Sequence, residues 1–96
     1  MKLVWTALAI EDREAIYDWI DRESPRNAIM IDTRISDSVE RLMEFPESGR
    51  AGRVAGTREL LVVRTPFIAV YGVADETIRI LRVLHGAQEW PDDIQR

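Results

Sequence analysis

The chain has 96 residues, a formal net charge of −4 at neutral pH, no cysteine and one histidine. Its length suits a single domain, and 46% apolar with 31% charged residues is typical of a globular protein rather than a disordered one. The lack of cysteine excludes disulfides and thiolate nucleophiles, and one histidine disfavours a histidine-based metal site, so we expect no metal and no cofactor. No apolar run approaches the roughly 20 residues that span a bilayer, and no signal-peptide pattern begins the chain, so we expect a cytoplasmic protein with no membrane partner.

The first residues predict a short strand followed by a helix. Residues 2–5 form an apolar run typical of a strand, and Thr6 after it suits a helix N-cap. From residue 7 to residue 22, apolar side chains recur at helical spacing while acidic side chains cover the other side. We interpret this acidic set as a solvated helix face, because no histidines oppose it to complete a metal site.

A second helix is predicted from residue 25 to about residue 44. Ser24 suits its N-cap, and Pro25 suits the first helical position, where a missing N–H costs nothing. Because so few residues separate the two predicted helices, they should form an antiparallel hairpin. Pro46 and Gly49 then end the helical half.

The second half of the chain changes to the periodicity of strands. After a link that contains Gly49, Gly52 and Gly56, residues 58–64, 67–73 and 77–84 are rich in aliphatic and aromatic side chains, with turn sequences between them. In the last strand, simple alternation places Ile78, Ile80, Arg82 and Leu84 on one face and Arg79, Leu81, Val83 and His85 on the other. The order strand, helix, helix, strand, strand, strand predicts an α+β fold, with a helical hairpin on one face of a mostly antiparallel four-stranded sheet. We expect residues 1–96 to form this one domain.

Charge is divided unevenly between the two halves. Residues 1–48 carry six basic and eleven acidic side chains, whereas residues 49–88 carry six arginines and three acidic side chains. The negative total argues against tight non-specific binding of nucleic acid, which depends on neutralising phosphates. The basic second half keeps an anionic partner open, and a set of solvated strand arginines is the alternative.

Residues along nearly the whole chain resemble one family. They are Trp5-Thr6, Ala9, Asp12-Arg13, residues 16–20, Ser24-Pro25, Phe45-Pro46, Gly49-Arg50, Gly52-Arg53, residues 56–60, residues 65–68, Val70-Tyr71, residues 80–88 and Trp90-Pro91. With these residues the chain resembles the RelE/ParE superfamily of toxins from bacterial type II toxin–antitoxin modules. The resemblance implies a growth-inhibiting toxin and favours the ParE-like, plasmid-stabilisation branch.

The two branches of the superfamily imply different activities. RelE-like members resemble ribosome-dependent messenger-RNA endoribonucleases, whose chemistry requires cations around a phosphate and a general acid or base. If this chain were such an enzyme, the resemblance would assign the catalytic roles to Arg58, Arg64, Arg82 and His85. ParE-like members resemble inhibitors of DNA gyrase and lack these catalytic groups.

Three departures from the ribonuclease pattern favour the gyrase-binding branch. Phe67 stands where ribonuclease members tend to carry an arginine, and the last strand ends in Leu84-His85-Gly86. The chain also has no lysine after Lys2. We therefore favour a non-enzymatic gyrase inhibitor. A ribosome-dependent endoribonuclease is the alternative, and a degenerate toxin that only binds its antitoxin is the third hypothesis.

The resemblance also implies a protein partner. A small sheet covered by helices on one face leaves strand edges and a groove for a peptide, and in the family the cognate antitoxin binds there. We therefore expect a hetero-oligomer with an antitoxin, and we predict an antitoxin- or target-binding role for Arg50, Arg53, Arg58, Arg64, Arg82 and Trp90. Two structural alternatives stay open: His85 can bond a loop, and Trp90 can seal the core.

Overall fold

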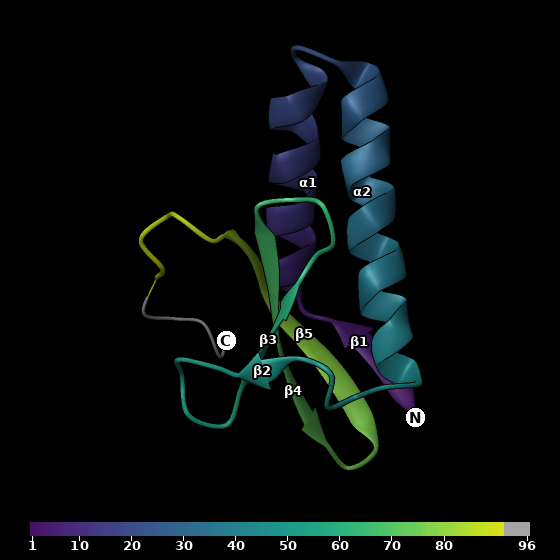
Figure 1. The fold of residues 1–96 in the computed structure, drawn as a ribbon, viewed down its shortest axis with the longest axis vertical. Coiled ribbons are helices and arrows are strands. Elements are labelled where there is room, and N and C mark those ends of the chain that lie inside the picture. Colours follow the sequence, from purple (N-terminus) through teal and green to yellow (C-terminus); the bar gives the residue numbers. More distant parts are fainter. Residues whose placement is uncertain (92–96) are drawn as a thin grey trace.

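The computed structural model describes residues 1–91 and shows a helical hairpin packed on a five-stranded sheet (Figure 1). The elements in chain order are β1 (Lys2–Trp5), α1 (Ala7–Asp21), α2 (Pro25–Glu40), the 3-10 turn η1 (Arg41–Met43), β2 (Arg50–Ala51), β3 (Arg58–Leu61), β4 (Phe67–Ala74) and β5 (Thr77–His85). The strands lie in the order β1-β5-β4-β3-β2. The β1–β5 pair is parallel and the other three pairs are antiparallel. The predicted α+β fold class is therefore confirmed.

The sheet has one strand more than predicted. The glycine-containing link includes β2, in which Arg50 and Ala51 pair with Glu59 and Arg58 of β3. Two residues are too short for an alternating pattern, so this strand has no periodic signal in the sequence. Residues 92–96 of the predicted domain lie outside the described residues.

The helices begin where their caps predict. The Thr6 hydroxyl accepts a hydrogen bond from the N–H of Ala9 at 3.1 Å, and the Ser24 hydroxyl accepts one from the N–H of Asn27 at 3.1 Å. Each bond satisfies one of the N–H groups that a helix start leaves unpaired. Pro25 occupies the first turn of α2, as expected.

Within residues 1–91, no helix is both long and apolar enough to cross a membrane.

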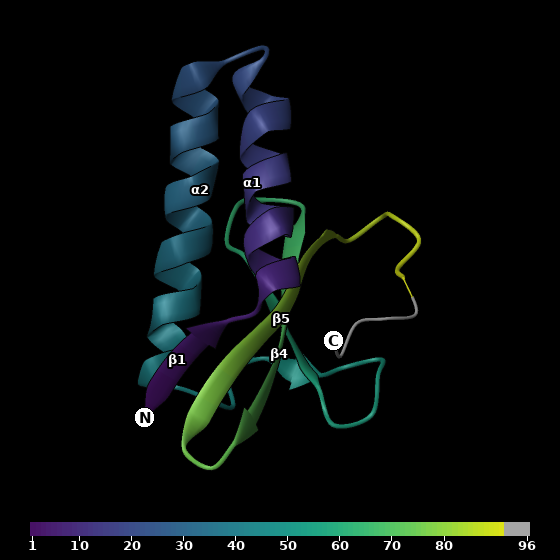
Figure 2. The ribbon, with the colours of Figure 1, turned by 180° about the vertical axis from the view of Figure 1, so that it is seen from behind.

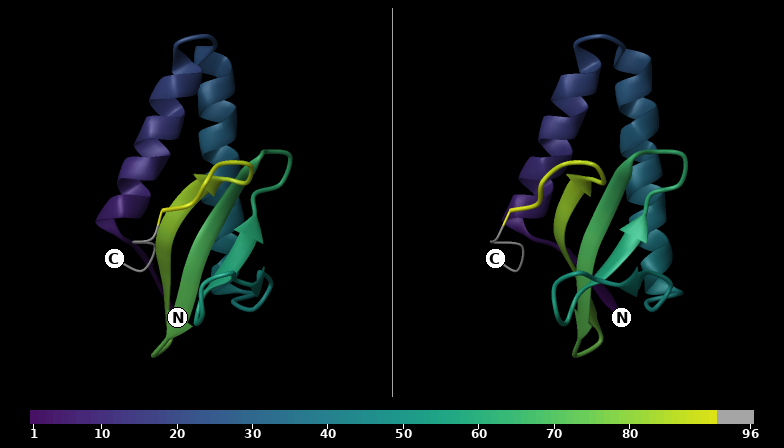
Figure 3. Two further views of the ribbon diagram at one scale, coloured as in Figure 1. Left: turned by 90° about the vertical axis from the view of Figure 1, so that its left-hand side faces the viewer. Right: turned by 60° about the vertical axis from the view of Figure 1, so that its left-hand side comes forward.

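The main core lies between the helices and one face of the sheet (Figures 1 and 2). Its buried side chains come from both layers: Ala9, Ile35, Val39 and Leu42 from the helical half, and Val62, Phe67, Ala69, Tyr71, Ile78, Ile80 and Val83 from the sheet half. A second cluster, Ile68, Val70, Leu81 and Leu84, lies on the other face, which we call the outer face. The chain after β5 turns back over this face (Figure 3), and Trp90 and Val54 pack against the cluster.

The predicted face alternation of the last strand is wrong beyond Leu81. Val70 pairs with Arg82 while the next residue, Tyr71, pairs with Ile80, so Leu81 is an extra residue in β5. Such a bulge reverses the direction of every later side chain. As a result Val83 joins Ile78 and Ile80 in the core under the helices, and Leu81 and Leu84 lie together on the outer face.

Candidate functional site

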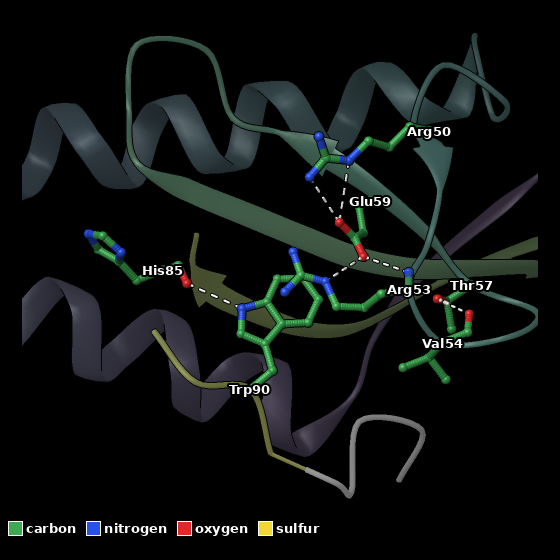
Figure 4. Close-up of polar contacts among 7 residues, drawn as sticks. All are labelled: Arg50, Arg53, Val54, Thr57, Glu59, His85 and Trp90. Atoms are coloured by element: carbon green, nitrogen blue, oxygen red, sulfur yellow. Dashed lines mark hydrogen bonds and ion pairs between the residues drawn. The ribbon is translucent and has the colours of Figure 1, made fainter. Parts of the chain in front are cut away.

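A buried carboxylate, Glu59 of β3, organises the basic residues of the preceding loop (Figure 4). Its side chain is only 3% exposed. One oxygen, Oε1, accepts a hydrogen bond from Arg50 Nη2 at 3.1 Å, and the other, Oε2, accepts from the Arg53 backbone N–H at 2.8 Å and from Arg53 Nε at 3.2 Å. Burial by itself raises the pKa of Glu59, but the bonds from Arg53 and Arg50 outweigh it, so the pKa lies below its ordinary value. Glu59 is therefore an ionised anchor for two arginines.

Arg53 also holds the C-terminal segment in place. Its guanidinium carbon lies 3.4 Å from the centroid of the Trp90 ring, and the indole Nε1 donates a hydrogen bond to the carbonyl of His85 at 3.3 Å (Figure 4). Trp90 and Val54 thereby cover the apolar cluster of the outer face. The protein's own loop and C-terminal segment close the face of the sheet that the helices leave open. Trp90 thus seals this secondary core, and its predicted binding role stays a prediction.

Arg82 joins the last strand to the first helix. Its Nε and Nη2 donate to the two carboxylate oxygens of Asp12 at 2.7 and 2.9 Å, and these side chains are 13% and 15% exposed. Asp12 also accepts the backbone N–H of Val83 at 2.9 Å. Because β1 pairs with β5 only as far as Ile80, Asp12 satisfies the strand edge at the point where β1 ends.

The other three candidate catalytic residues lie on β3, in the β3–β4 turn and at the end of β5. Arg58 Nη1 donates to the carbonyl of Gly49 at 2.8 Å, which fixes the loop before β2. Arg64 lies in the β3–β4 turn with a positive φ of 59°. The Nδ1 atom of His85 accepts the N–H of Ala87 at 3.0 Å, which closes the turn after β5. In the sheet, β4 lies between the strands that carry Arg58 and Arg82.

Tyr71 supports the same loop as Arg58 from inside the core. Its hydroxyl donates to the carbonyl of Pro46 at 2.8 Å and accepts the N–H of Gly49 at 3.0 Å. The side chain is fully buried, and burial raises its pKa above the ordinary value. A Cβ on Gly49 would lie 2.7 Å from the Tyr71 hydroxyl oxygen, so glycine is required for this approach.

An apolar groove of about 730 Å³ lies between the end of α2 and β3. We call it the Leu61 groove. Its apolar surface comes from Phe45, Leu61 and Val63, which are 52%, 59% and 60% exposed, and Arg41, Glu44 and Glu47 are charged residues of its lining. Sequence reasoning did not single out these residues. The signal was present as the unbroken apolar run of residues 60–63, which a strand buried on one face only does not require.

The groove lies beside an open strand edge. β2 pairs only with Arg58 and Glu59, so no strand pairs with the remainder of β3 on that side within the described chain. The N–H of Val62 donates to Phe67 of the β4 side, and backbone direction alternates along a strand, so the N–H of Leu61 points toward the open edge. Apolar side chains and unpaired backbone groups together suit an added peptide segment.

Among residues 1–91, no group of three or more histidine, aspartate and glutamate side chains is placed to hold a metal ion.

Comparison with known proteins identifies the family. Residues 3–90 match the family of the ParE toxin of the type II toxin–antitoxin system, parDE. This chain belongs to the ParE toxin family. It is a toxin of a type II toxin–antitoxin system, as the sequence resemblance predicted.

Two relatives of this ParE-family chain are named toxins. It is 36% identical over 90 residues to toxin Y4kP of Sinorhizobium fredii, which covers 94% of this chain and 93% of the relative. It is 39% identical over 87 residues to toxin RelE2 of Caulobacter vibrioides, and the matched part covers 91% of this chain and 97% of the relative.

Two solved structures resemble the ParE-family chain in fold. A chain of the chromosomal ParDE system from P. aeruginosa is 34% identical with a TM-score of 0.79, covering 88% of this chain and 95% of that one. A chain of the toxin–antitoxin complex RelBE2 from Mycobacterium tuberculosis is 22% identical with a TM-score of 0.57, covering 91% of this chain and 92% of that one. This second likeness supports the fold alone.

Proposed function

We propose that this ParE-family toxin inhibits growth in the cytoplasm by binding DNA gyrase, without catalysis of its own, and that a cognate antitoxin neutralises it as a hetero-oligomer. One observation carries the choice of a binding mechanism. A ribonuclease mechanism would use Arg82 of the last strand as a cation at the phosphate. In this structure Arg82 forms a largely buried ion pair with Asp12 through two hydrogen bonds.

The energy of that pair weighs against a phosphate role for Arg82. Removing one partner from a buried ion pair typically costs about 3–5 kcal/mol, because the other charge is left uncompensated. A phosphate that took over these two donors would leave the Asp12 carboxylate without its arginine partner beside β5. The outer face adds a second obstacle, since Trp90 already covers it and Arg53 is bonded to Glu59.

The proposed antitoxin site is the Leu61 groove with the open edge of β3. Full burial of an exposed leucine or phenylalanine side chain contributes roughly 1.5–3 kcal/mol, so a partner that covers the half-exposed side chains of Phe45, Leu61 and Val63 gains part of that amount at each. The partner in this proposal is an extended or helical segment with apolar anchors. Leu61→Asp should therefore weaken antitoxin binding while the toxin stays active.

One experiment separates the gyrase and ribonuclease mechanisms. The chain is expressed without its antitoxin, messenger-RNA ends are mapped by primer extension, and purified protein is assayed for inhibition of gyrase supercoiling. Inhibited supercoiling with intact messages is the expected result. Messenger-RNA cleavage at defined codon positions would instead show ribonuclease activity. Normal growth with neither effect would show that the chain is a degenerate toxin.

A matched variant sharpens the result. His85→Ala removes the one imidazole but leaves its backbone contact with Trp90 available, so supercoiling inhibition should persist. A ribonuclease that uses His85 for proton transfer would lose most of its activity in the same variant.

A further inference from the structure

A second groove, of about 450 Å³, is lined by residues of α1, the end of β1 and Asp32 of α2, and shares no lining residue with the Leu61 groove. Its apolar lining consists of Trp5, at the end of β1, with Ile10 and Tyr17 of α1. Ile10 is 46% exposed although it is aliphatic. We call this feature the Tyr17 groove. The strands that border the two grooves, β1 and β3, are separated in the sheet by β5 and β4.

The charged residues of the Tyr17 groove are not balanced. Arg13 donates two hydrogen bonds to Asp32, at 2.6 and 3.0 Å, and its guanidinium carbon lies 5.0 Å from the centroid of the Trp5 ring. This arginine is therefore committed to a neighbouring acid. The side-chain carboxylates of Glu14 and Asp18, also in the lining, have no hydrogen bond or ion pair within residues 1–91.

The spacing of Glu14 and Asp18 is unfavourable for the isolated helix. Residues four apart lie side by side on a helix, and two like charges at this spacing destabilise it. Both carboxylates also flank Tyr17, an aromatic side chain in the same lining. Paired carboxylates beside an aromatic ring attract a guanidinium or ammonium group, through charge-assisted hydrogen bonds and through the face of the ring.

We propose that the Tyr17 groove docks the toxin's protein target, through a target segment that carries an arginine or lysine next to an aliphatic side chain. Charge complementarity selects this occupant. The cation pairs with Glu14 and Asp18, and the aliphatic side chain covers Ile10. This inference rests on the proposed toxin function and assigns to that function a surface separate from the antitoxin site.

The test uses a variant that should fold at least as well as the parent. Glu14→Gln with Asp18→Asn removes the like-charge repulsion and changes no buried side chain, so the thermal midpoint should stay equal or rise. We expect at least a tenfold loss of growth inhibition with unchanged affinity for the antitoxin. Glu11→Gln with Asp21→Asn is the control, because it removes the same charge from exposed positions of α1 outside the groove and should retain full inhibition.

Three results would overturn the proposal. The first is full growth inhibition by the Glu14→Gln, Asp18→Asn variant. The second is a loss of antitoxin affinity in that variant, which would show that the antitoxin binds in this groove. The third is self-association of the parent chain that this variant abolishes in sedimentation, which would give the groove to a second copy.

A direct probe keeps the groove testable apart from toxicity. Nuclear magnetic resonance titration with a synthetic peptide of alternating arginine and leucine should shift the Trp5 indole signal and the amides of residues 10–18. A peptide with glutamate in place of arginine should not, and the Glu14→Gln, Asp18→Asn variant should lose the response. Equal shifts in variant and parent would contradict the proposal. If the parent chain does not inhibit growth, the proposed function fails, and this titration still decides the chemistry of the groove.

Discussion

Arg53 and Trp90 lie face to face, with the guanidinium carbon 3.4 Å from the centroid of the indole ring. The edge of the same guanidinium is bonded to the buried carboxylate of Glu59. The arginine therefore connects the aromatic ring of Trp90 to β3 of the sheet. Such a contact between a cation and an aromatic ring contributes about 0.5–2 kcal/mol, depending on how far the pair is removed from water.

Trp90→Ala should destabilise the protein by about 2 kcal/mol, less than for a fully buried tryptophan because Trp90 is only partly buried. The loss has two causes: the outer-face cluster loses its cover, and Arg53 loses the ring. Chemical denaturation followed by circular dichroism measures the change. Trp19→Ala is the matched control, since Trp19 is 64% exposed and its removal should cost less than about 0.5 kcal/mol. Equal effects of the two substitutions would show that Trp90 seals nothing.

The pH dependence of stability should carry the signature of Glu59. Its pKa is lower in the folded protein than its ordinary value of 4.5, so the unfolded chain binds the proton more readily. The stabilisation by Glu59 is therefore complete above that ordinary value and is lost as the pH falls through the lower folded-state pKa. Urea denaturation between pH 7 and pH 3 measures this slope.

Glu59→Gln provides the comparison for the pH experiment. The amide keeps one acceptor for Arg50 or Arg53 but carries no charge and does not titrate. The variant should be less stable at pH 7 by about 1–3 kcal/mol, and its stability should fall less steeply in acid. An unchanged acid slope in Glu59→Gln would mean that other carboxylates account for the loss.

Much of the architecture is predictable because its causes are local. Thr6 and Ser24 start their helices through bonds to residues three positions ahead, and such caps can be read from the sequence alone. β3, β4 and β5 follow from runs of aliphatic and aromatic residues between turn sequences.

The site is harder to predict because its contacts join distant parts of the chain. Asp12 and Arg82 are 70 positions apart, and the residues around each in the sequence do not indicate that the two side chains form an ion pair. The bulge at Leu81 depends on the partner strand, so alternation within β5 alone gives the wrong faces. Sequence reasoning could list the arginines of the second half. Which of them are occupied by Asp12 and Glu59 follows only from the fold.

Tyr71→Phe should loosen the loop that borders the Leu61 groove. The substitution leaves the buried N–H of Gly49 and the carbonyl of Pro46 without their shared partner, which costs about 1–3 kcal/mol. Because Pro46 lines the groove, antitoxin affinity should fall as well. Unfolding and titration calorimetry measure the two effects. Gly72→Ala is the control, since a Cβ there meets only the carbonyl oxygen of Gly56 at 3.7 Å and should leave both quantities nearly unchanged.

The Asp12–Arg82 pair gives the strongest test of a structural against a catalytic arginine. Arg82→Ala should destabilise the protein by about 3–5 kcal/mol, because it leaves the Asp12 carboxylate uncompensated in a largely buried position. Asp12→Ala with Arg82→Ala removes both charges and should recover part of that loss, which a double-mutant cycle measures as the coupling energy.

Growth inhibition by the double variant then decides between the roles. If Arg82 serves only to join α1 to β5, Asp12→Ala with Arg82→Ala should inhibit growth as well as the parent does per folded molecule, once protein levels are matched. A cation that contacts phosphate cannot be replaced by restoring stability, so a ribonuclease would stay inactive in both variants. Loss of inhibition despite recovered folding would therefore contradict the binding mechanism and return Arg82 to a catalytic role.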